Sequence, residues 1–286
     1  MAKNGDVSVK ATISVLLRAS TINASDPQKA QVIAELRSLG VNLVTGELVD
    51  SSLEDLVSIF KLYSTIISCS GFIGGKRLQA KLAEAALSAG VKRYLPWQFG
   101  VDYDIIGRGS AQDLFDEQLD VRDTLRAQSA TEWVIVSTGM FTSFLFEPFF
   151  GVVDLENSKI NALGSLDDRV TVTAATDIGL LTAEIVFAEP RIKNQVVYTA
   201  GDTVSYRQLA DKLESVLRVT LQRNVLSVAE LTAALAADPQ DALKKYRAVF
   251  AGGKGVAWPK EASYNAQHEI PVTDVETYIR DNLVKK

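Results

Sequence analysis

Cysteine and histidine are almost absent from this sequence of 286 residues, which contains one of each, Cys69 and His268. One cysteine cannot form an internal disulfide bond, and the two residues together cannot supply a zinc or iron–sulfur ligand set. Because Cys69 lies in the run T-I-I-S-C-S, we expect it to be buried and unreactive. We expect His268, in an irregular stretch near the C-terminus, to be a surface or structural residue. No metal site is therefore expected.

Long hydrophobic runs and an excess of basic residues are also missing. No segment approaches the length of a membrane-spanning helix, and the N-terminus has no signal-peptide core. The 30 basic and 35 acidic residues give a net charge of −5, which argues against a broad nucleic-acid-binding face. Hydrophobic and charged fractions of 47% and 23% are typical of soluble globular proteins. We therefore expect a cytoplasmic protein that binds neither membranes nor nucleic acids.

Predicted strands and helices alternate through the first half of the chain. The expected strands span residues 13–17, 41–45, 65–69, 91–95 and 133–137. Helical spacing of apolar residues fills the intervals, and two of the helices have clear start signals, Ser25-Asp26-Pro27 and the capping-box sequence Ser51-Ser52-Leu53-Glu54. This alternation predicts an α/β fold with a Rossmann-like doubly wound parallel sheet.

The alternation loosens from about residue 141, after which the chain is strongly aromatic as far as residue 150. Further strands are expected near Ile160 and at 169–173 and 195–199, and helices are expected to start at Asp177 and Ser205. The remainder is expected to be mostly helical. We divide the chain into a NAD(P)-binding Rossmann-like domain at residues 1–140 and a smaller α/β substrate-binding lobe at 141–286, interleaved with the sheet.

The stretch V-K-R-Y-L-P-W-Q-F-G-V-D-Y-D, residues 91–104, is the expected ligand site. Pro96 cannot continue a strand and restricts Leu95 to extended geometry, so the strand should end there. In an open α/β sheet, ligands bind in the crevice at the carboxyl ends of the strands. A packed aromatic corner is the alternative, but Gln98, Asp102 and Tyr103 are polar residues that such a corner would not need.

Five motifs in order along the chain resemble those of the isoflavone-reductase branch of the NmrA-like, atypical short-chain dehydrogenase superfamily, and fungal isoflavone-reductase-like proteins of the CipA type most of all. The motifs are Arg18 and Ser20 after a strand, Asp26-Pro27-Gln28-Lys29, Gly46-Glu47-Leu48-Val49-Asp50, Val91-Lys92-Arg93-Tyr94-Leu95-Pro96, and Phe99-Gly100-Val101-Asp102. The resemblance covers nearly the whole chain and implies an NADPH/NADP-dependent protein.

The resemblance places the adenosine 2′-phosphate of NADPH at Arg18 and Lys29, with Ser20 or Thr21 as a hydroxyl partner. A guanidinium can bind a phosphate bidentately, and no acidic residue follows the first strand to bind a free ribose hydroxyl, as an NAD site would require. Two surface cations without a ligand are the alternative. The other expected cofactor-binding residues are Ser70, Gly71, Pro96, Gln98 and Phe99.

The chain departs from this family in the region that should hold the pyrophosphate. Relatives begin with a strand, a glycine-rich turn and a helix whose N-terminus binds the phosphates. No such unit precedes Ile13, and residues 1–9 resemble only the end of that helix. We therefore expect the phosphate-binding turn and the central strand of the sheet to be missing, which leaves apolar sheet edges exposed. The turn at 71–75 follows a different strand and is not expected to replace it.

A second departure concerns catalysis, because the family's sequence of Phe, two acidic residues and a catalytic Lys is here Phe115-Asp116-Glu117-Gln118. An amide can orient or polarise a carbonyl group but cannot transfer a proton as Lys does. We expect Gln118, Tyr103 and Asp102 to form the catalytic group, with the proton supplied by Tyr103, Asp102, Glu117 or water. The expected substrate-binding residues are Trp97, Met140, Phe141 and Phe144.

Three functions are consistent with this sequence. The first is an NADPH-dependent oxidoreductase of secondary metabolism, monomeric or homodimeric, that reduces a small aromatic or polyketide-like metabolite. The second is a non-catalytic, NADP(H)-binding regulatory or sensor protein of the NmrA type. The third is a shortened product that binds no cofactor. The aromatic residues around the crevice favour the first function, and Gln118 favours the second.

Overall fold

The structure, a computed structural model, describes residues 11–72 and 74–284, and its main sheet has four parallel strands. Their order is β10-β5-β4-β3. The strands are β3 (Thr65–Ile67), β4 (Arg93–Leu95), β5 (Glu132–Ser137) and β10 (Gln195–Tyr198). β4 ends at Leu95, as the proline that follows it predicts.

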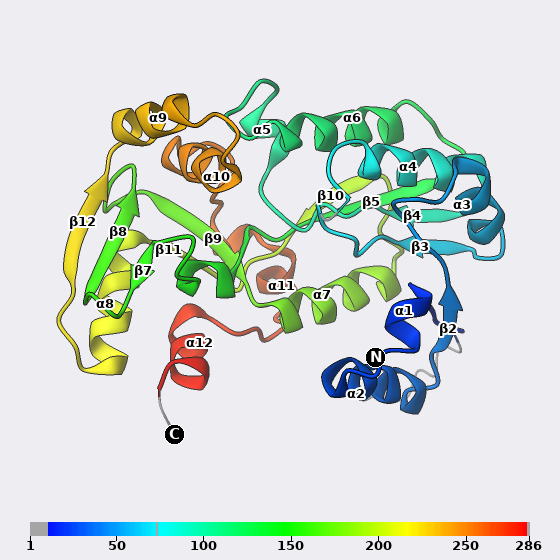
Figure 1. Cartoon of the computed structure of the whole chain (residues 1–286), viewed down its shortest axis with the longest axis horizontal. Helices are drawn as coiled ribbons and strands as arrows, with labels where there is room; N and C mark the ends of the chain where they lie inside the picture. Colours follow the sequence, from blue (N-terminus) through cyan, green and yellow to red (C-terminus); the bar gives the residue numbers. More distant parts are fainter. Residues whose placement is uncertain (1–10, 73, 285–286) are drawn as a thin grey trace.

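Helices cover both faces of this sheet (Figure 1). α3 (Leu53–Phe60), α4 (Leu78–Ser88) and α6 (Leu114–Arg126) pack on one face, and α7 (Ala175–Phe187) packs on the other. Successive residues of β5 alternate between the two cores: Trp133 and Ile135 face the three helices, and Val134 and Val136 face α7. The prediction of a Rossmann-like doubly wound sheet is confirmed.

β1 (Ser14–Leu17) and β2 (Asn42–Thr45) form a separate parallel pair, accompanied by α1 (Ala19–Ile22) and α2 (Pro27–Ser38). Within residues 11–72 and 74–284, no strand lies between β1 and β3 to join the two sheets. β3 is correspondingly half-buried, whereas every residue of β4 is buried. The prediction that a central strand is missing stays a prediction, because residues 1–10 lie outside the described residues. The interpretation of residues 1–9 as the end of a helix lies outside the described residues.

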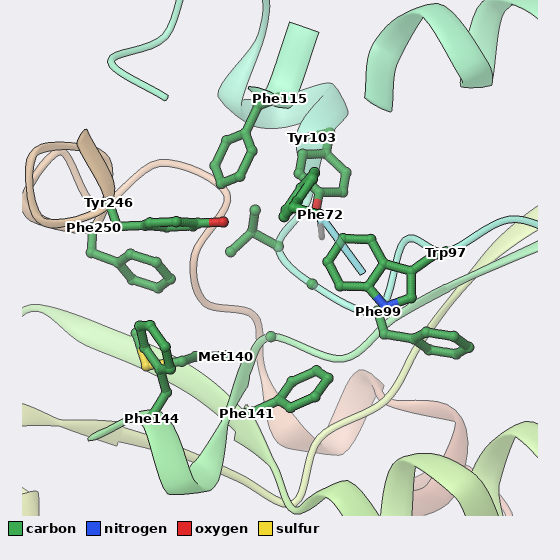
Figure 2. Close-up of a pocket in the computed structure, with 13 residues that line it drawn as sticks. Phe72, Trp97, Phe99, Tyr103, Phe115, Met140, Phe141, Phe144, Tyr246 and Phe250 are labelled. Atoms are coloured by element: carbon green, nitrogen blue, oxygen red, sulfur yellow. The ribbon is translucent and has the colours of Figure 1, made fainter. Parts of the chain in front are cut away.

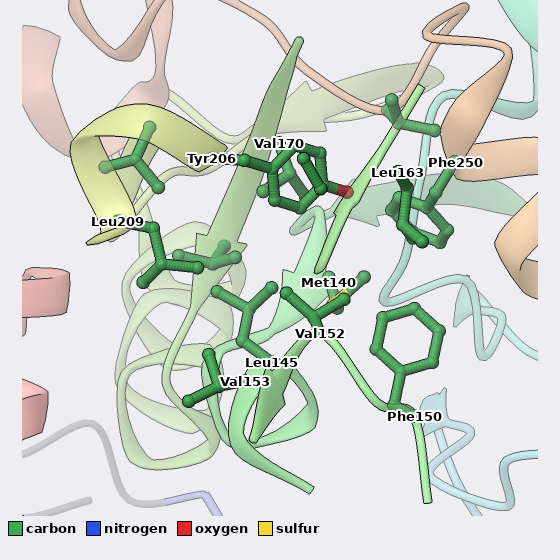
Figure 3. Packing of buried hydrophobic residues seen from close by; sticks show 14 of the residues in the cluster. Met140, Leu145, Phe150, Val152, Val153, Leu163, Val170, Tyr206, Leu209 and Phe250 are labelled. Carbon is green, nitrogen blue, oxygen red and sulfur yellow. The ribbon is translucent and has the colours of Figure 1, made fainter. Parts of the chain in front are cut away.

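The C-terminal half adds two three-stranded sheets, ordered β11-β9-β6 and β12-β8-β7. The strands are β6 (Met140–Phe141), β7 (Val153–Asp154), β8 (Lys159–Leu163), β9 (Arg169–Thr173), β11 (Asp202–Ser205) and β12 (Gln222–Leu226). The helices are α5 (Tyr103–Ile106), α8 (Tyr206–Leu217), α9 (Val228–Ala237), α10 (Ala242–Ala251), α11 (Tyr264–Gln267), α12 (Val275–Asn282), and the 3-10 helices η1 (Thr142–Phe146) and η2 (Lys260–Ala262). Figure 3 shows the core they enclose, in which Leu145, Val152 and Leu209 are fully buried.

Three local predictions need correction. Cys69 is exposed rather than buried, because β3 already ends at Ile67 and the cysteine lies in the loop beyond it. The capping box of α3 is formed by Ser52 and Asp55, one residue later than the sequence suggested. The short strands β11 and β12 were not predicted. Among the described residues, none of the helices has both the length and the apolar character needed to cross a membrane.

Candidate functional site

An aromatic cavity of about 190 Å³ lies where the loop after β4, the turn after β5 and α10 meet. Figure 2 shows the rings that surround it. Of the residues predicted to bind ligand, Trp97, Phe99, Tyr103, Met140, Phe141 and Phe144 line this cavity. The loop after β4 and the start of the C-terminal half, which lie 40 residues apart in sequence, are thus brought to one site. No charged side chain of the described residues lines it.

Four further aromatic side chains complete the wall, and sequence analysis did not single them out as ligand-binding residues. Phe72 comes from the loop after β3 and meets Trp97 edge to face, with ring centroids 4.5 Å apart. The other three are Phe115 of α6 and Tyr246 and Phe250 of α10. The spacing of Tyr246 and Phe250, one helical turn apart, was a signal that they share one face of a helix.

Glycine is required at the turn that carries β5 into the cavity wall. Gly139 has φ of +71°, and a Cβ atom there would lie 2.1 Å from the carbonyl oxygen of Thr171. Any side chain would therefore collide with β9 and adopt a strained backbone conformation. This close approach directs Met140 into the cavity.

Asp102 positions Tyr103 and does not line the cavity. Its Oδ1 accepts hydrogen bonds from the backbone N–H groups of Asp104 and Ile105 and so caps α5, at 3.1 and 3.4 Å. Its Oδ2 accepts the hydroxyl hydrogen of Tyr198 at 2.8 Å. Both carboxylate oxygens are therefore engaged in holding the loop, so the geometry gives Asp102 a structural role and leaves its predicted catalytic role without support.

Gln98 is likewise held inside the protein by the fully buried Arg122. Arg122 Nε donates to Gln98 Oε1 at 2.7 Å, and Gln98 Nε2 donates to the carbonyl oxygen of Gln118 at 2.8 Å. Arg122 also donates to Asp104 at 2.6 Å and lies 5.2 Å from the ring centroid of Tyr103. These bonds fix the loop after β4 on α6, so the Gln98 side chain supports the site from behind and does not face a ligand.

Gln118 is fully buried, and neither atom of its amide has a hydrogen-bond partner among the described residues. It is not among the residues that line the cavity, although Phe115, one turn earlier on α6, is. The neighbouring Glu117 accepts hydrogen bonds from the backbone N–H groups of Arg77 at 2.7 Å and Ala80 at 3.1 Å, so it caps the start of α4. Glu117 is thereby committed to the fold and is not placed to transfer a proton in the cavity.

The predicted adenosine-phosphate residues lie on the separate β1–β2 unit. Arg18 is exposed at the end of β1, and its Nε lies 3.0 Å from Glu47 Oε2. This bond leaves the two terminal guanidinium nitrogens for a ligand. Ser20 and Lys29 are also exposed, on α1 and α2. Ser70 and Gly71 are held by the buried Gln79, whose Nε2 donates to the Ser70 hydroxyl at 3.1 Å and to the Gly71 carbonyl at 2.6 Å.

The described residues fit the two ends of a dinucleotide better than its middle. Arg18 and Lys29 offer positive charge at one end, and the aromatic cavity at the other is suited to a flat ring. Between them, the start of α4 is the helix terminus nearest to the loop Gly71–Gly75, but Glu117 already occupies it. That carboxylate would repel a pyrophosphate bound at this helix terminus. Pro96, at the end of β4, is buried.

Burial controls the protonation of the two phenols in the cavity. It raises the pKa of Tyr246 to about 12. It also raises the pKa of Tyr103, with the neighbouring Tyr246 adding to the effect and Arg122 opposing it. Both phenols are therefore protonated at neutral pH and act as hydrogen-bond donors. His268 does not line the cavity. It is exposed, and its ring stacks on that of Tyr264 with the two centroids 4.1 Å apart.

Comparison with known proteins identifies a family from the sequence and related solved structures from the fold. A family model for the NmrA-like family matches residues 5–265. An NmrA-like family domain-containing oxidoreductase of Gibberella moniliformis is 48% identical over 277 residues, which are 96% of this chain and 90% of that protein. Phenylcoumaran benzylic ether reductase Pyrc5 of Pyrus communis is 29% identical over 280 residues, or 93% and 88% of the two chains.

Solved structures with the same fold include a binary complex of leucoanthocyanidin reductase with NADPH from Vitis vinifera. It has a TM-score of 0.77 and 21% identity, and the match covers 96% of this chain and 92% of that chain. A crystal structure of isoflavone reductase has a TM-score of 0.76 and 20% identity, with 94% and 90% covered. At these identities the structures establish the shared fold.

Proposed function

Because this chain belongs to the NmrA-like family, we propose that it is an NADPH-dependent oxidoreductase that reduces a small, neutral, aromatic or polyketide-like molecule. The observation that carries the proposal is the aromatic cavity at the carboxyl ends of β4 and β5, the edge of the sheet where α/β proteins bind ligands. Relatives named as oxidoreductases and reductases support the reaction class.

The substrate class follows from the lining of the cavity. Ten of its residues carry aromatic or methionine side chains, and none of the described lining residues is charged, so a charged substrate would lose its hydration without a counter-ion. A flat, neutral ring would instead bury apolar surface against Trp97 and Phe141 and gain edge-to-face contacts. The cavity is below the roughly 300–1,000 Å³ of ordinary ligand pockets, which favours a compact ring system.

In this proposal Arg18 and Lys29 hold the 2′-phosphate of NADPH, and Ser20 adds a hydroxyl. When bound, the cofactor supplies the hydride. Glu47 orients Arg18 through Nε, so the two terminal nitrogens can bind the phosphate together. Ser70 and Gly71, in the loop after β3, and Phe99, in the cavity wall, complete the proposed cofactor-binding set. The aromatic wall excludes water from the reacting atoms.

Tyr103 is the group best placed to supply a proton. Among the candidates from sequence, it alone lines the cavity, because Asp102 and Glu117 are committed to helix caps and Gln118 does not line it. Its raised pKa keeps the phenol protonated, so it can donate a hydrogen bond to a developing negative charge on oxygen.

The second candidate is a non-catalytic, NADP(H)-binding regulatory protein, which Gln118 favours because its amide cannot titrate. Fluorescence titration with NADPH and NADP⁺, followed by a screen for NADPH oxidation with aromatic ketones, separates the two. Binding of both nucleotides with ketone-dependent oxidation supports the reductase. Binding without turnover of any ketone supports the regulator. The absence of binding of either nucleotide contradicts both and supports the third possibility, a protein that keeps the fold without the cofactor.

A further inference from the structure

Two phenol hydroxyls reach the aromatic cavity from opposite halves of the chain. Tyr103 belongs to α5, after β4, and Tyr246 belongs to α10, in the C-terminal half. Figure 2 shows the Tyr246 oxygen directed toward the middle of the cavity and the Tyr103 oxygen directed toward the side where Phe72 lies. Apart from the indole nitrogen of Trp97, these are the side-chain hydrogen-bond donors among the described lining residues.

Packing fixes the direction of both rings. Phe115 packs edge to face against Tyr103 and against Tyr246, with ring centroids 4.9 and 5.8 Å apart. Phe144 also packs edge to face against Tyr246, with ring centroids 6.3 Å apart. Gly100 leaves room for the Tyr103 hydroxyl, because a Cβ atom there would lie 2.7 Å from that oxygen. The rings are therefore held in place, and each hydroxyl has a defined direction.

Neither hydroxyl forms a hydrogen bond with another described residue, and neither is among the fully enclosed side-chain oxygens that lack a partner, so both stay accessible from the cavity. A hydroxyl in apolar surroundings gains free energy when a ligand supplies an acceptor. Tyr198, which is half-buried and does not line the cavity, shows the contrast, because its hydroxyl is bonded to Asp102. The unpaired donors of the cavity point to a ligand that supplies the missing acceptor.

We propose that the hydroxyls of Tyr246 and Tyr103 bind one acceptor oxygen of the ligand, and that Tyr246 is a specificity-determining residue that selects oxygen-bearing aromatic molecules over hydrocarbons of the same shape. A carbonyl, ether or phenol oxygen has two lone pairs and can accept from both donors at once. This inference deepens the proposed function. Only the statement that the bound ligand is a substrate rests on that function.

Binding of a matched pair of probes to the unliganded protein tests the inference without NADPH and without turnover. Acetophenone carries a carbonyl oxygen, and cumene replaces that oxygen by a methyl group at nearly the same shape. Affinities for both are measured by NMR titration of the unchanged protein and of Tyr246→Phe, Tyr103→Phe and Tyr278→Phe. Tyr278 stacks on Phe146 outside the cavity and serves as the matched control.

We expect Tyr246→Phe to lower the ratio of acetophenone to cumene affinity by about 3- to 10-fold, the loss of one hydrogen bond. Tyr103→Phe should lower the ratio by a similar factor, and Tyr278→Phe should leave it unchanged. A ratio that neither cavity variant changes, or no measurable binding of acetophenone to the unchanged protein, overturns the inference. Because no cofactor is present, these outcomes are independent of NADPH binding, on which the proposed function depends.

Discussion

The carboxylate of Glu117 on α6 accepts the backbone N–H of Arg77 at 2.7 Å and thereby closes the N-terminal end of α4. The two residues are 40 positions apart, so this cap is tertiary rather than local. Arg77 itself has a positive φ of 73° and no side chain that caps the helix. The bond therefore stabilises a helix start that its own sequence does not provide.

Glu117→Ala should lower the free energy of unfolding by about 0.5–2 kcal/mol, the usual range for loss of a helix cap. Glu117→Gln keeps an acceptor oxygen and should retain most of the stability. Urea unfolding monitored by circular dichroism measures both. If Glu117 were instead the proton donor of a reaction, Glu117→Gln would abolish turnover while the protein stayed fully stable, and that result would contradict our assignment.

Arg122 should be among the least replaceable residues of the chain. It is fully buried and bonds Gln98, Asp104 and Ser137. Arg122→Met keeps much of the volume but leaves buried acceptors without a partner, and we expect a loss of about 3–5 kcal/mol in unfolding free energy.

Arg108→Met is the control for Arg122→Met. Arg108 pairs with Asp120 and Asp123 on an exposed face, where ion pairs contribute about 0–1 kcal/mol. The same urea titration compares the two variants. Equal losses would show that the buried network does not stabilise the fold in the way we describe.

Stability should fall at low pH. The hydrogen bond from Arg126, together with Arg122, lowers the pKa of Asp104 to about 2, and Lys245 and Lys76 lower the pKa of Asp113 to about 2. A carboxyl group whose pKa is lower in the folded state contributes stability above its unfolded pKa of about 3.9, and this contribution is lost as the pH falls toward 2.

Urea unfolding at several pH values between about 2 and 5 tests this dependence, and Asp104→Asn should make it less steep in that window. Asp167→Asn is the comparison. Arg207 also lowers the pKa of Asp167, but this pair lies on an exposed surface, where solvent screening should make its contribution smaller. An unchanged slope in Asp104→Asn would mean that this carboxyl group does not contribute to acid sensitivity.

Gln118→Met should stabilise the protein. Both polar atoms of the buried Gln118 amide lack partners among the described residues, and a methionine of similar shape removes that cost, a gain of about 1–3 kcal/mol. Thermal unfolding measures the gain. A lower melting temperature would show that the amide is satisfied by a group such as a buried water. Weaker NADPH binding in an otherwise stabilised variant would place the amide at the cofactor.

Arg18→Ala should weaken the binding of NADPH by about 10-fold or more and leave NADH almost unaffected, because only NADPH carries the 2′-phosphate. Arg37→Ala is the matched control, because Arg37 is a basic residue in the last turn of α2, the helix that carries Lys29. Fluorescence titration of each variant with both nucleotides gives the ratio of NADPH affinity to NADH affinity. Equal losses for NADPH and NADH in Arg18→Ala would remove the assignment of the phosphate site.

Several features of the site were predictable from local sequence. Pro96 fixed the end of β4, and the aromatic residues after β4 and after β5 indicated segments that the structure brings to one cavity. These signals depend on the geometry of a few consecutive residues, and such geometry survives in any tertiary context. The contributions of Tyr246 and Phe250 to the cavity could not be predicted, because helical spacing identifies the residues that share a face but not what that face packs against.

The roles of polar residues were the least predictable part. Asp102, Gln98 and Glu117 stand in or near the ligand-binding segment, yet their side chains cap helices or hold Arg122. A carboxylate or amide has the same chemistry in either use, and only the position of its partners decides between them. Cys69 shows the same limit, because β3 ends at Ile67 rather than at residue 69 and the thiol is therefore exposed instead of buried.

The sequence by itself determined the succession of strands and helices in the first half of the chain and the doubly wound sheet, because the periodicity of apolar residues and the signals that end each element are local properties. Tertiary structure alone decided which side chains surround the cavity and which donors in it lack partners. Those facts depend on contacts between residues far apart in the sequence, such as Tyr103 and Tyr246, which both pack against Phe115.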